Sequence, residues 1–393
     1  MDDFRFTKNA SGEVKISEEG YCYFVPNTIP PKLDLSEKLM RRFLESTVGL
    51  AKLDGKLSGI RDAERFILID AFARKEAVSS SRIEGIETDV ADTYKADREP
   101  ENDPFKASDL QEVKNYKEAL ELGLREIAGG KDITMDLVLR MHTILMRGVR
   151  GADMMPGMIR NIPVKVGGKW DSMEDAFFVP PLETYLESLL ENLFTYIGNG
   201  SGNPLLDAAL AHYQFEAIHP FLDGNGRIGR LLIMLMLRKS GLMEHPVLYL
   251  SEYFNRRRKM YSVILFNVSS KGEFDSWFGY FLNAIDSQIA GAAKTIERLS
   301  EYRARLYMIS EGNEKLRLLC DMLFENPYVR VKDVTGRLGI TDPTAQKLID
   351  VLLKREVLAE EPGKRKGKLY KAEALLDILS DTGDAADPLF QPL

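Results

Sequence analysis

One short stretch of this sequence combines residue types that can handle a phosphate group. It offers an imidazole at His219, a carboxylate at Asp223 and two guanidinium groups three residues apart, at Arg227 and Arg230. The Gly-Asn-Gly segment 224–226 permits positive φ angles and a close backbone approach, so several N–H groups can turn toward one anion. The sequence predicts a phosphate-handling site here, because a base, a carboxylate, an anion nest and two cations occur within twelve residues.

Two helices are expected to position this loop. Asn203-Pro204 is typical of a helix start, and apolar residues then recur at spacings of three and four as far as His219. Pro220 cannot continue this helix, so His219 is expected on its last turn. A second helix is expected from about Arg227 until Gly241 stops it, and its N-terminus adds partial positive charge beside the loop. The imidazole and the anion nest should therefore face each other across a short turn.

These residues match every specified position of HPFx[DE]GNGRxxR, the signature of the Fic family, which the chain resembles here. The alternative is a helix–loop–helix whose glycines only make a tight turn. That alternative explains the glycines but not the imidazole, the carboxylate and both guanidinium groups together. The resemblance implies that AMP is transferred from ATP, with Mg²⁺, to a Ser, Thr or Tyr hydroxyl of a target protein, and that pyrophosphate is released.

The resemblance also gives each residue of the signature a role. His219 is expected to take the proton of the acceptor hydroxyl, because a neutral imidazole with a pKa of about 6.5 suits a general base. Asp223, a hard oxygen ligand, is expected to hold Mg²⁺ against the phosphates. The remaining residues are expected to bind the α- and β-phosphates (Gly224, Asn225 with its side chain, Gly226 and Arg227) or the γ-phosphate (Arg230).

A second motif lies at the end of a helix expected over Asp62 to about Ile83. Ser80 and Glu84 are four residues apart and share one face, and Gly85 is placed to end the helix. On its own this is a polar helix face with a C-cap glycine, although a carboxylate there opposes the helix dipole. The pattern is similar to the inhibitory motif of the Fic family, Ser/Thr-x-x-x-Glu-Gly/Asn. That resemblance implies that Glu84 enters the active site, pairs with Arg230 and displaces the γ-phosphate.

The segment 157–180 interrupts the helical pattern. Alternating apolar residues before Gly167-Gly168 and an apolar run after them predict a β-hairpin. It is either an ordinary surface hairpin or, as the resemblance implies, a flap that holds a target segment in extended form by backbone pairing. The stretch 163–166 is less polar than is usual in the family, which leaves the target preference open.

A helix is expected over Tyr249 to Phe266, after the signature. Many Fic proteins carry two adjacent tyrosines here that bound the nucleotide base. Tyr261 matches the first of them, whereas Ser262 stands at the second position. His142 and His212 also fall in expected helices, and we interpret both as packed rather than catalytic.

The last part of the chain predicts a different unit. Three expected helices and two short strands around a basic segment resemble a winged helix-turn-helix domain. Polar and basic residues of the third helix and the wing could contact DNA: Thr344, Gln346, Lys347, Lys364, Arg365 and Lys366. Acidic residues dilute this patch, so a protein-contact or dimerisation role stays open beside DNA binding.

Composition narrows the class of protein. The net charge of −7 gives no global basic field for nucleic acid. Two cysteines far apart in sequence argue against a disulfide scaffold and against a zinc site. No apolar run approaches the roughly 18 residues of a membrane helix, and no signal peptide is apparent. We therefore expect a cytoplasmic protein.

The expected fold is mainly α, with a Fic helical core, a β-hairpin flap and a C-terminal winged helix-turn-helix domain. Four segments are expected, namely an N-terminal region with the inhibitory helix, the Fic core, a helical linker and the winged helix domain: 1–105, 106–289, 290–313 and 314–393. The resemblance makes a homodimer an expectation. Three other activities stay open: a hydrolase that removes AMP from a modified target, a DNA-binding regulator whose core senses nucleotide, and transfer of UMP or phosphocholine.

Overall fold

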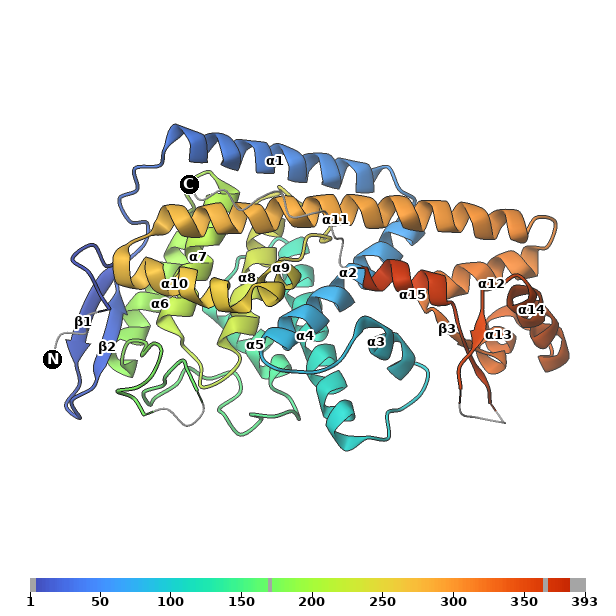
Figure 1. Ribbon diagram of the computed structural model, residues 1–393, viewed down its shortest axis with the longest axis horizontal. Helices are drawn as coiled ribbons and strands as arrows, with labels where there is room; N and C mark the ends of the chain where they lie inside the picture. The colour runs from blue at the N-terminus through green and yellow to red at the C-terminus, as the bar shows by residue number, and fades with distance from the viewer. Residues whose placement is uncertain (1–4, 169–171, 363–366, 382–393) are drawn as a thin grey trace.

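The computed structural model describes residues 5–168, 172–362 and 367–381, and these ranges are mainly helical (Figure 1). The N-terminal and central helices are α1 (Glu37–Ser58), α2 (Asp62–Ile83), α3 (Val90–Ala96), α4 (Pro104–Ala128), α5 (Met135–Leu145), α6 (Leu186–Asn199), α7 (Pro204–Ile218), α8 (Asn225–Lys239), α9 (Ser251–Arg256) and α10 (Arg258–Lys271). The C-terminal helices are α11 (Phe274–Ile309), α12 (Glu314–Glu325), α13 (Val331–Leu338), α14 (Asp342–Lys354) and α15 (Glu373–Ser380). A single 3-10 turn, Glu183–Tyr185, precedes α6.

Helices α7 and α8 form the centre of the core. Nearly every residue of both is buried, including Arg227 and Arg230 in the first turns of α8, so both helices lie inside the protein. The Asn203 side chain accepts a hydrogen bond from the Leu206 N–H (3.2 Å), and Pro204 follows in the first turn, which confirms the expected helix start. The second helix begins at Asn225, two residues earlier than expected, because Gly224 adopts a φ of 82° and turns the chain directly into it.

The other helices surround this pair. Helices α1 and α11 run side by side along one edge of the molecule (Figure 1), where Phe43 and Phe278 are in edge-to-face contact and the Ser46 hydroxyl donates to Asp286 Oδ1 (2.6 Å). Helix α2 packs against α4 and α9, so its C-terminal end lies beside the core. The helix expected over Tyr249 to Phe266 is divided into α9 and α10 at Arg257.

Two small antiparallel sheets are formed by the described residues. Strands β1 (Gly12–Ile16) and β2 (Cys22–Pro26) make a hairpin at one end of the molecule, with Gly12 opposite Pro26 (Figure 1). Strands β3 (Tyr328–Arg330), β4 (Ala359–Glu360) and β5 (Leu369–Lys371) make a sheet in the order β3-β5-β4. The described residues therefore form a mainly helical fold with two small sheets, one near the N-terminus and one in the C-terminal part of the chain.

The β-hairpin expected over 157–180 was largely wrong. Within its described residues, the backbone forms one isolated bridge, in which the N–H groups of Val166 and Phe178 each donate to the other residue's carbonyl (2.8 and 3.0 Å). Proline at 163 and at 180 removes two N–H donors from the stretches that would flank this bridge. The segment is thus an irregular loop joined by a single β-contact, and residues 169–171 lie outside the described ranges.

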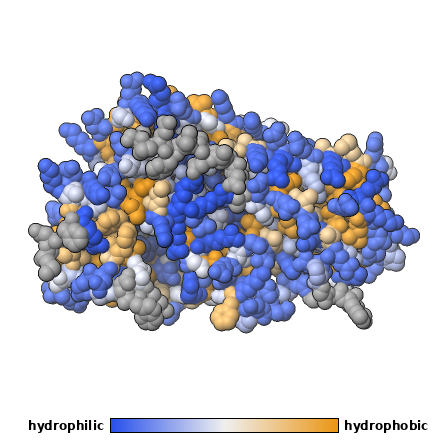
Figure 2. Space-filling model, in the orientation of Figure 1, coloured by the Kyte–Doolittle hydropathy of each residue, from blue (hydrophilic) through white to orange (hydrophobic). Residues whose placement is uncertain are grey.

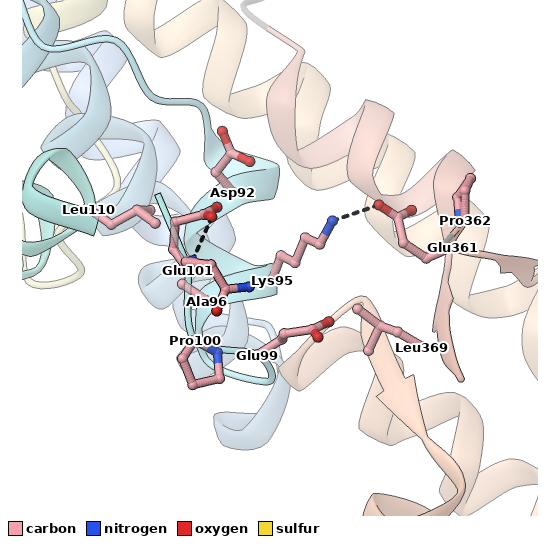
Figure 3. Close-up of a pocket in the computed structure, with 11 residues that line it drawn as sticks. Asp92, Lys95, Ala96, Glu99, Pro100, Glu101, Leu110, Glu361, Pro362 and Leu369 are labelled. Atoms are coloured by element: carbon pink, nitrogen blue, oxygen red, sulfur yellow. Dashed lines mark hydrogen bonds and ion pairs between the residues drawn. The ribbon is translucent and has the colours of Figure 1, made fainter. Parts of the chain in front are cut away.

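The C-terminal helices and strands lie beyond α11, which continues past residue 289 without interruption. The expected helices are present as α12, α13 and α14, and α15 was not expected. A cavity of about 240 Å³ lies between part of this unit and α3, where Lys95 and Glu361 form an ion pair (2.8 Å; Figure 3). Beside it the two are in direct contact, since the Asn326 amide donates to the Tyr94 carbonyl (3.0 Å). The basic wing residues Lys364, Arg365 and Lys366 fall outside the described ranges. The winged-helix assignment and the four domain boundaries remain predictions.

Hydrophilic residues cover most of the face drawn in Figure 2, and apolar ones show between them. Within the described ranges, we find no helix that combines the length and the apolar character needed to cross a bilayer.

Candidate active site

His219 terminates α7 in a left-handed conformation. Its φ and ψ are 52° and 61°, and its N–H donates to the Phe215 carbonyl (2.9 Å). A non-glycine residue adopts this conformation at a cost, so the surrounding structure must hold it. His219 Nδ1 lies 3.3 Å from the Glu216 carbonyl oxygen. Since a carbonyl only accepts hydrogen bonds, this contact places the proton on Nδ1 and leaves the lone pair on Nε2.

The His219 imidazole is neutral at physiological pH. Burial lowers its pKa to about 4, and the positive charge of Arg160 adds to this effect. Glu84 and Asp223 act in the opposite direction but do not outweigh burial. An imidazole that is neutral at pH 7 can accept a proton, as a general base must.

The loop after His219 is held by its own side chains. Asp223 Oδ1 accepts from the Gly224 N–H (2.5 Å) and from Arg227 Nη2 (3.2 Å). The Asp223 side chain is 40 % exposed, so the carboxylate also faces the open site. The Asn225 amide donates to the Phe221 carbonyl and accepts from the Phe221 N–H, both at 2.8 Å. Both ends of that amide are thus engaged within the turn, and Asn225 shapes the loop instead of presenting its side chain to a phosphate.

Arg227 is buried beneath the loop. Its Nη1 forms an ion pair with Glu112 Oε2 on α4 (2.8 Å), and both side chains are 2 % exposed. Burial raises the pKa of Glu112 despite the opposing charge of Arg227. Arg227 therefore supports Asp223 from below, and its guanidinium contacts Glu112, Asp223 and the Met146 sulfur rather than open space.

Arg230 meets the end of α2. Its Nη2 lies 2.7 Å from Glu84 Oε1 and donates to the Ser80 carbonyl (3.1 Å), while its Nε donates to the Ser80 hydroxyl (2.8 Å). Glu84 caps α2, and Gly85 follows with a φ of 90°. Burial acts to raise the pKa of Glu84, but the charge of Arg230, helped by Arg227 and Arg258, outweighs it and lowers the pKa. The pair is therefore ionised.

The Glu84 carboxylate also lies close to Gly226. A Cβ added to Gly226 would come within 2.8 Å of Glu84 Oε1 and within 2.9 Å of Arg230 Nη1. Gly226 belongs to the first turn of α8, where unpaired N–H groups and the helix dipole favour an anion. The structure thus brings the two predicted motifs together, with the Glu84 carboxylate beside Gly226 at the start of α8.

A cavity of about 110 Å³ opens beside His219. Its walls are mostly apolar, with a few polar groups, and they include Val166, Phe178, Glu216, Tyr261, Ser262 and Leu265. The Tyr261 ring stacks on Phe254 with 4.7 Å between centroids, and its hydroxyl lies 2.6 Å from His212 Nε2. Tyr261 is therefore a fixed wall of this cavity, with its hydroxyl already engaged.

His142 has a structural role in the site that the sequence did not reveal. Its ring stacks on Phe221 (3.9 Å between centroids), its Nδ1 accepts from the Gly157 N–H (2.8 Å), and its Nε2 lies 2.9 Å from the Asp223 carbonyl oxygen. It therefore links the metal-binding candidate Asp223 to the segment 157–180. Glu112 and Arg160 also contact site residues and were not singled out, because their partners lie far away in the sequence.

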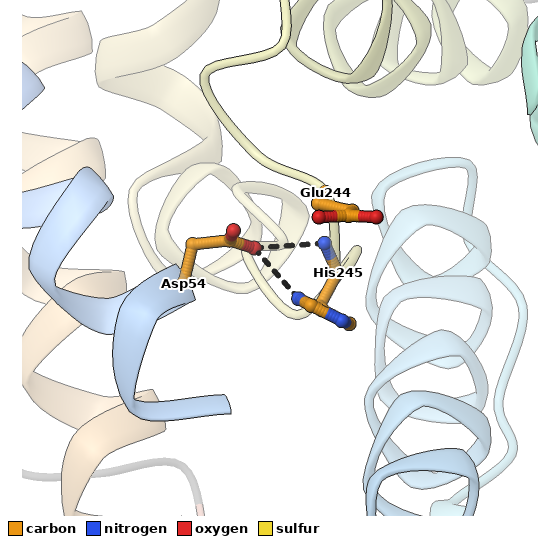
Figure 4. A group of neighbouring side chains, drawn as sticks. All are labelled: Asp54, Glu244 and His245. Atoms are coloured by element: carbon orange, nitrogen blue, oxygen red, sulfur yellow. Dashed lines mark hydrogen bonds and ion pairs between the residues drawn. The ribbon is translucent and has the colours of Figure 1, made fainter. Parts of the chain in front are cut away.

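A second group of potential metal ligands lies away from this site (Figure 4). Asp54 Oδ1 accepts from the backbone N–H of His245 (2.8 Å) and lies 3.1 Å from His245 Nδ1, with Glu244 adjacent. These hydrogen bonds tie α1 to the loop after α8 and account for the arrangement without a metal.

Comparisons with known proteins agree with this geometry. Residues 132–237 match the model of the Fic/DOC family, and residues 40–125 match that of the Fic/DOC family N-terminal region. The chain is 33% identical over 129 residues to the protein adenylyltransferase fic-1 of Caenorhabditis elegans, covering 31% of this chain and 23% of that protein. It is 34% identical over 113 residues to the protein adenylyltransferase Fic of Drosophila grimshawi, covering 28% and 21%. The chain therefore spans less than a quarter of the length of these curated relatives.

Two solved structures share the fold. A Fic family protein from Desulfovibrio desulfuricans G20 aligns with a TM-score of 0.55 at 20% identity, over 87% of this chain and 98% of that one. A Fic domain containing signaling protein from Bacteroides thetaiotaomicron aligns with a TM-score of 0.50 at 18% identity, over 63% of this chain and 97% of that one. At this identity the likeness concerns the fold alone.

Proposed function

We propose that this chain is a protein adenylyltransferase of the Fic/DOC family that carries its own inhibitor, Glu84. The observation that carries the proposal is the position of the Glu84 carboxylate, bound to Arg230 over the anion nest at Gly226. The neutral imidazole of His219 supplies the base that such a reaction needs. Both curated relatives named above are called protein adenylyltransferases, which supports the same activity.

The reaction transfers AMP to a Ser, Thr or Tyr hydroxyl of a target protein. The hydroxyl oxygen attacks the α-phosphorus of ATP, a new oxygen–phosphorus bond forms, and the bond to the β-phosphate oxygen breaks so that pyrophosphate leaves. The hydroxyl proton passes to Nε2 of His219, whose Nδ1 is held by the Glu216 carbonyl.

Different residues around the loop bind different parts of ATP. The backbone N–H groups of residues 224–226 receive the α- and β-phosphates at the N-terminus of α8, and Arg230 receives the γ-phosphate. Arg227 acts through Asp223, which it holds in place from its buried position. The cavity beside Tyr261 and Ser262 accommodates the nucleotide base.

Asp223 fits a Mg²⁺ ion. Magnesium sites usually combine one or two carboxylates with phosphate oxygens and water, and Asp223 presents a partly exposed carboxylate beside the nest. When bound, the ion would neutralise phosphate charge. The loop keeps Asp223 oriented through the Gly224 N–H and Arg227.

Inhibition follows from competition for the same place. Glu84 carries negative charge where the polyphosphate would bind, and it occupies the guanidinium that would anchor the γ-phosphate. ATP can bind productively only after Glu84 has moved. The Ser80 hydroxyl and carbonyl keep Arg230 in position meanwhile.

We further propose that the target lies along the segment 157–180, whose Val166 and Phe178 line the cavity beside His219. For the C-terminal unit we propose a winged helix-turn-helix domain with a protein-contact role. Gln346 supports this role over DNA binding, because its side chain is already bonded to Asp350 (2.8 Å). A homodimer remains part of the proposal.

The intact mass of the full-length Glu84→Gly protein tests this function. The protein is incubated with Mg²⁺ and with ATP, GTP or UTP separately, and Glu84→Gly/His219→Ala serves as the matched control. We expect an increment equal to AMP with ATP, and none with the control. No increment with ATP, although calorimetry shows that the variant binds ATP, would contradict the proposal, and an increment with UTP alone would replace AMP by UMP.

A further inference from the structure

Arg160 lies at the start of the segment 157–180 and reaches the catalytic histidine from there. The residue is 2 % exposed. Its Nε donates to the His219 carbonyl (2.8 Å), its Nη1 to the Ile162 carbonyl (3.1 Å) and its Nη2 to the Pro181 carbonyl (2.6 Å). Its backbone N–H donates to the Pro220 carbonyl (2.9 Å). One side chain thus joins both ends of this segment to the end of α7.

This guanidinium is buried without a carboxylate in contact. None of the ion pairs among the described residues includes Arg160, and its partners are carbonyl oxygens. Burial lowers the pKa of Arg160 to about 10, although Glu183 and Tyr21 act in the opposite direction. A buried charge is costly unless hydrogen bonds compensate for it, so these carbonyls must satisfy the guanidinium.

The carbonyls at the end of α7 need such a partner. The last carbonyls of a helix receive no hydrogen bond from an N–H of the same helix, so they need another donor. A cation near them also complements the helix dipole. His219 ends α7 with a positive φ, which requires restraint from outside the helix. Arg160 supplies that restraint from a part of the chain 59 residues away.

We propose that Arg160 is a positioning residue, which fixes the end of α7 against both ends of the segment 157–180 and so aims the His219 imidazole at the acceptor hydroxyl. The inference rests on the proposed function for the identity of that hydroxyl. The planar fork of an arginine directs donors at three carbonyls from three directions. A lysine carries the same charge but offers its donors from one atom, so it cannot hold all three segments together.

Kinetics of Arg160→Lys and Arg160→Gln test the positioning, both in full-length Glu84→Gly protein. Arg140→Gln, at an exposed position of α5, is the matched control. We expect the Kd of ATP with Mg²⁺ to change less than about threefold, while kcat for auto-modification falls about 10²-fold in both Arg160 variants. Unchanged kcat in both variants would overturn the proposal.

A second readout does not depend on the reaction. The ¹³Cε1 signal of His219 reports its pKa, and the charged groups that act on this imidazole are Arg160, Glu84 and Asp223. Arg160→Gln should raise the pKa of His219 because a positive charge is lost, whereas Arg160→Lys should leave it low. An unchanged titration in Arg160→Gln would overturn the proximity on which the proposal depends.

These experiments distinguish a failure of the proposed function from a failure of the proposed role of Arg160. If Glu84→Gly protein transfers no group at all, the proposed function fails, and the titration still decides whether Arg160 acts on His219. If the Arg160 variants do not fold, the Nε–H signal of Arg160 is followed in the wild-type protein. Slow exchange with solvent supports the buried bond to the His219 carbonyl, and fast exchange like that of Arg140 overturns it.

Discussion

Glu84 and Arg230 are 146 residues apart in the sequence, and their side chains meet at 2.7 Å over Gly226. The Arg230 side chain is 2 % exposed and the Glu84 side chain 33 %. The buried partner is therefore fixed and the more exposed one can leave. Because Glu84 caps α2, movement of the end of that helix would carry the Glu84 carboxylate away from Arg230.

Replacing Glu84 should lower the stability of the protein, because the ion pair with Arg230 is lost. In Glu84→Gln, the charge of Arg230 loses its ionic partner but keeps its bonds to Ser80, so we expect a loss of roughly 1–3 kcal/mol. Added pyrophosphate should restore more stability to the variant than to the wild type, since the nest is then open. Thermal melting with and without pyrophosphate measures both effects. Equal melting temperatures and equal shifts would contradict the competition between Glu84 and phosphate.

The protonation of His219 can be followed by NMR. Burial and the charge of Arg160 place its pKa at about 4, so its ¹³Cε1 signal should stay constant from pH 7 down to pH 5. The chain has four histidines, and His219→Ala identifies the signal. A transition at about 6.5, the ordinary value, would show that the imidazole is solvated rather than buried.

The buried pair of Glu112 and Arg227 should contribute strongly to the stability of the core. Glu112→Ala leaves the Arg227 charge with only Asp223 and costs about 3 kcal/mol in the free energy of unfolding. Urea denaturation measures this loss. Glu118→Ala, on the same helix but paired with Arg147 at the surface, is the control and should cost less than about 1 kcal/mol. Similar losses in both variants would mean that the buried ion pair contributes no more to stability than the surface pair.

Glu216 should make stability fall as pH rises. Burial raises the pKa of its carboxyl from 4.5 to about 7, against the effect of Arg230. The folded protein therefore keeps a proton that the unfolded chain releases above 4.5, and the stability from that proton is lost as pH rises through 7. Glu216→Gln cannot ionise and should gain roughly 1–3 kcal/mol over the wild type between pH 5 and pH 8. Denaturation of both proteins at pH 5 and at pH 8 tests this. A difference in the free energy of unfolding between variant and wild type that is the same at both pH values would contradict it.

The signature loop could be predicted from sequence because its chemistry is local. The site residues lie on a single loop and on the two helix ends that flank it: His219, Asp223 and Arg230. The residues that start and stop those helices can be recognised in the sequence, and they define the geometry. The contact between Glu84 and Arg230 could be expected only through the resemblance to a family, since no spacing rule connects residues on two separate helices.

Other features left no local signal. Arg160 acts on carbonyl oxygens, which every residue possesses, so no residue type in the sequence marks its partners. Glu112 meets Arg227 across 115 residues. The hairpin prediction over 157–180 took alternating apolar residues as a strand, but Ile162 is 52 % exposed and proline interrupts the pairing, so the pattern did not reflect a pleated sheet.

Transfer of label from α-³²P-ATP tests the central claim most directly. Wild-type protein, Glu84→Gly and Glu84→Gly/His219→Ala are compared with Mg²⁺ at equal concentration, and γ-³²P-ATP serves as a second donor. We predict that Glu84→Gly takes up α-label at least about tenfold faster than the wild type, that the double variant takes up none, and that γ-label is never transferred. Glu84→Gly protein that binds ATP but is labelled no faster than the wild type would contradict the claim that Glu84 inhibits a nucleotidyl transfer.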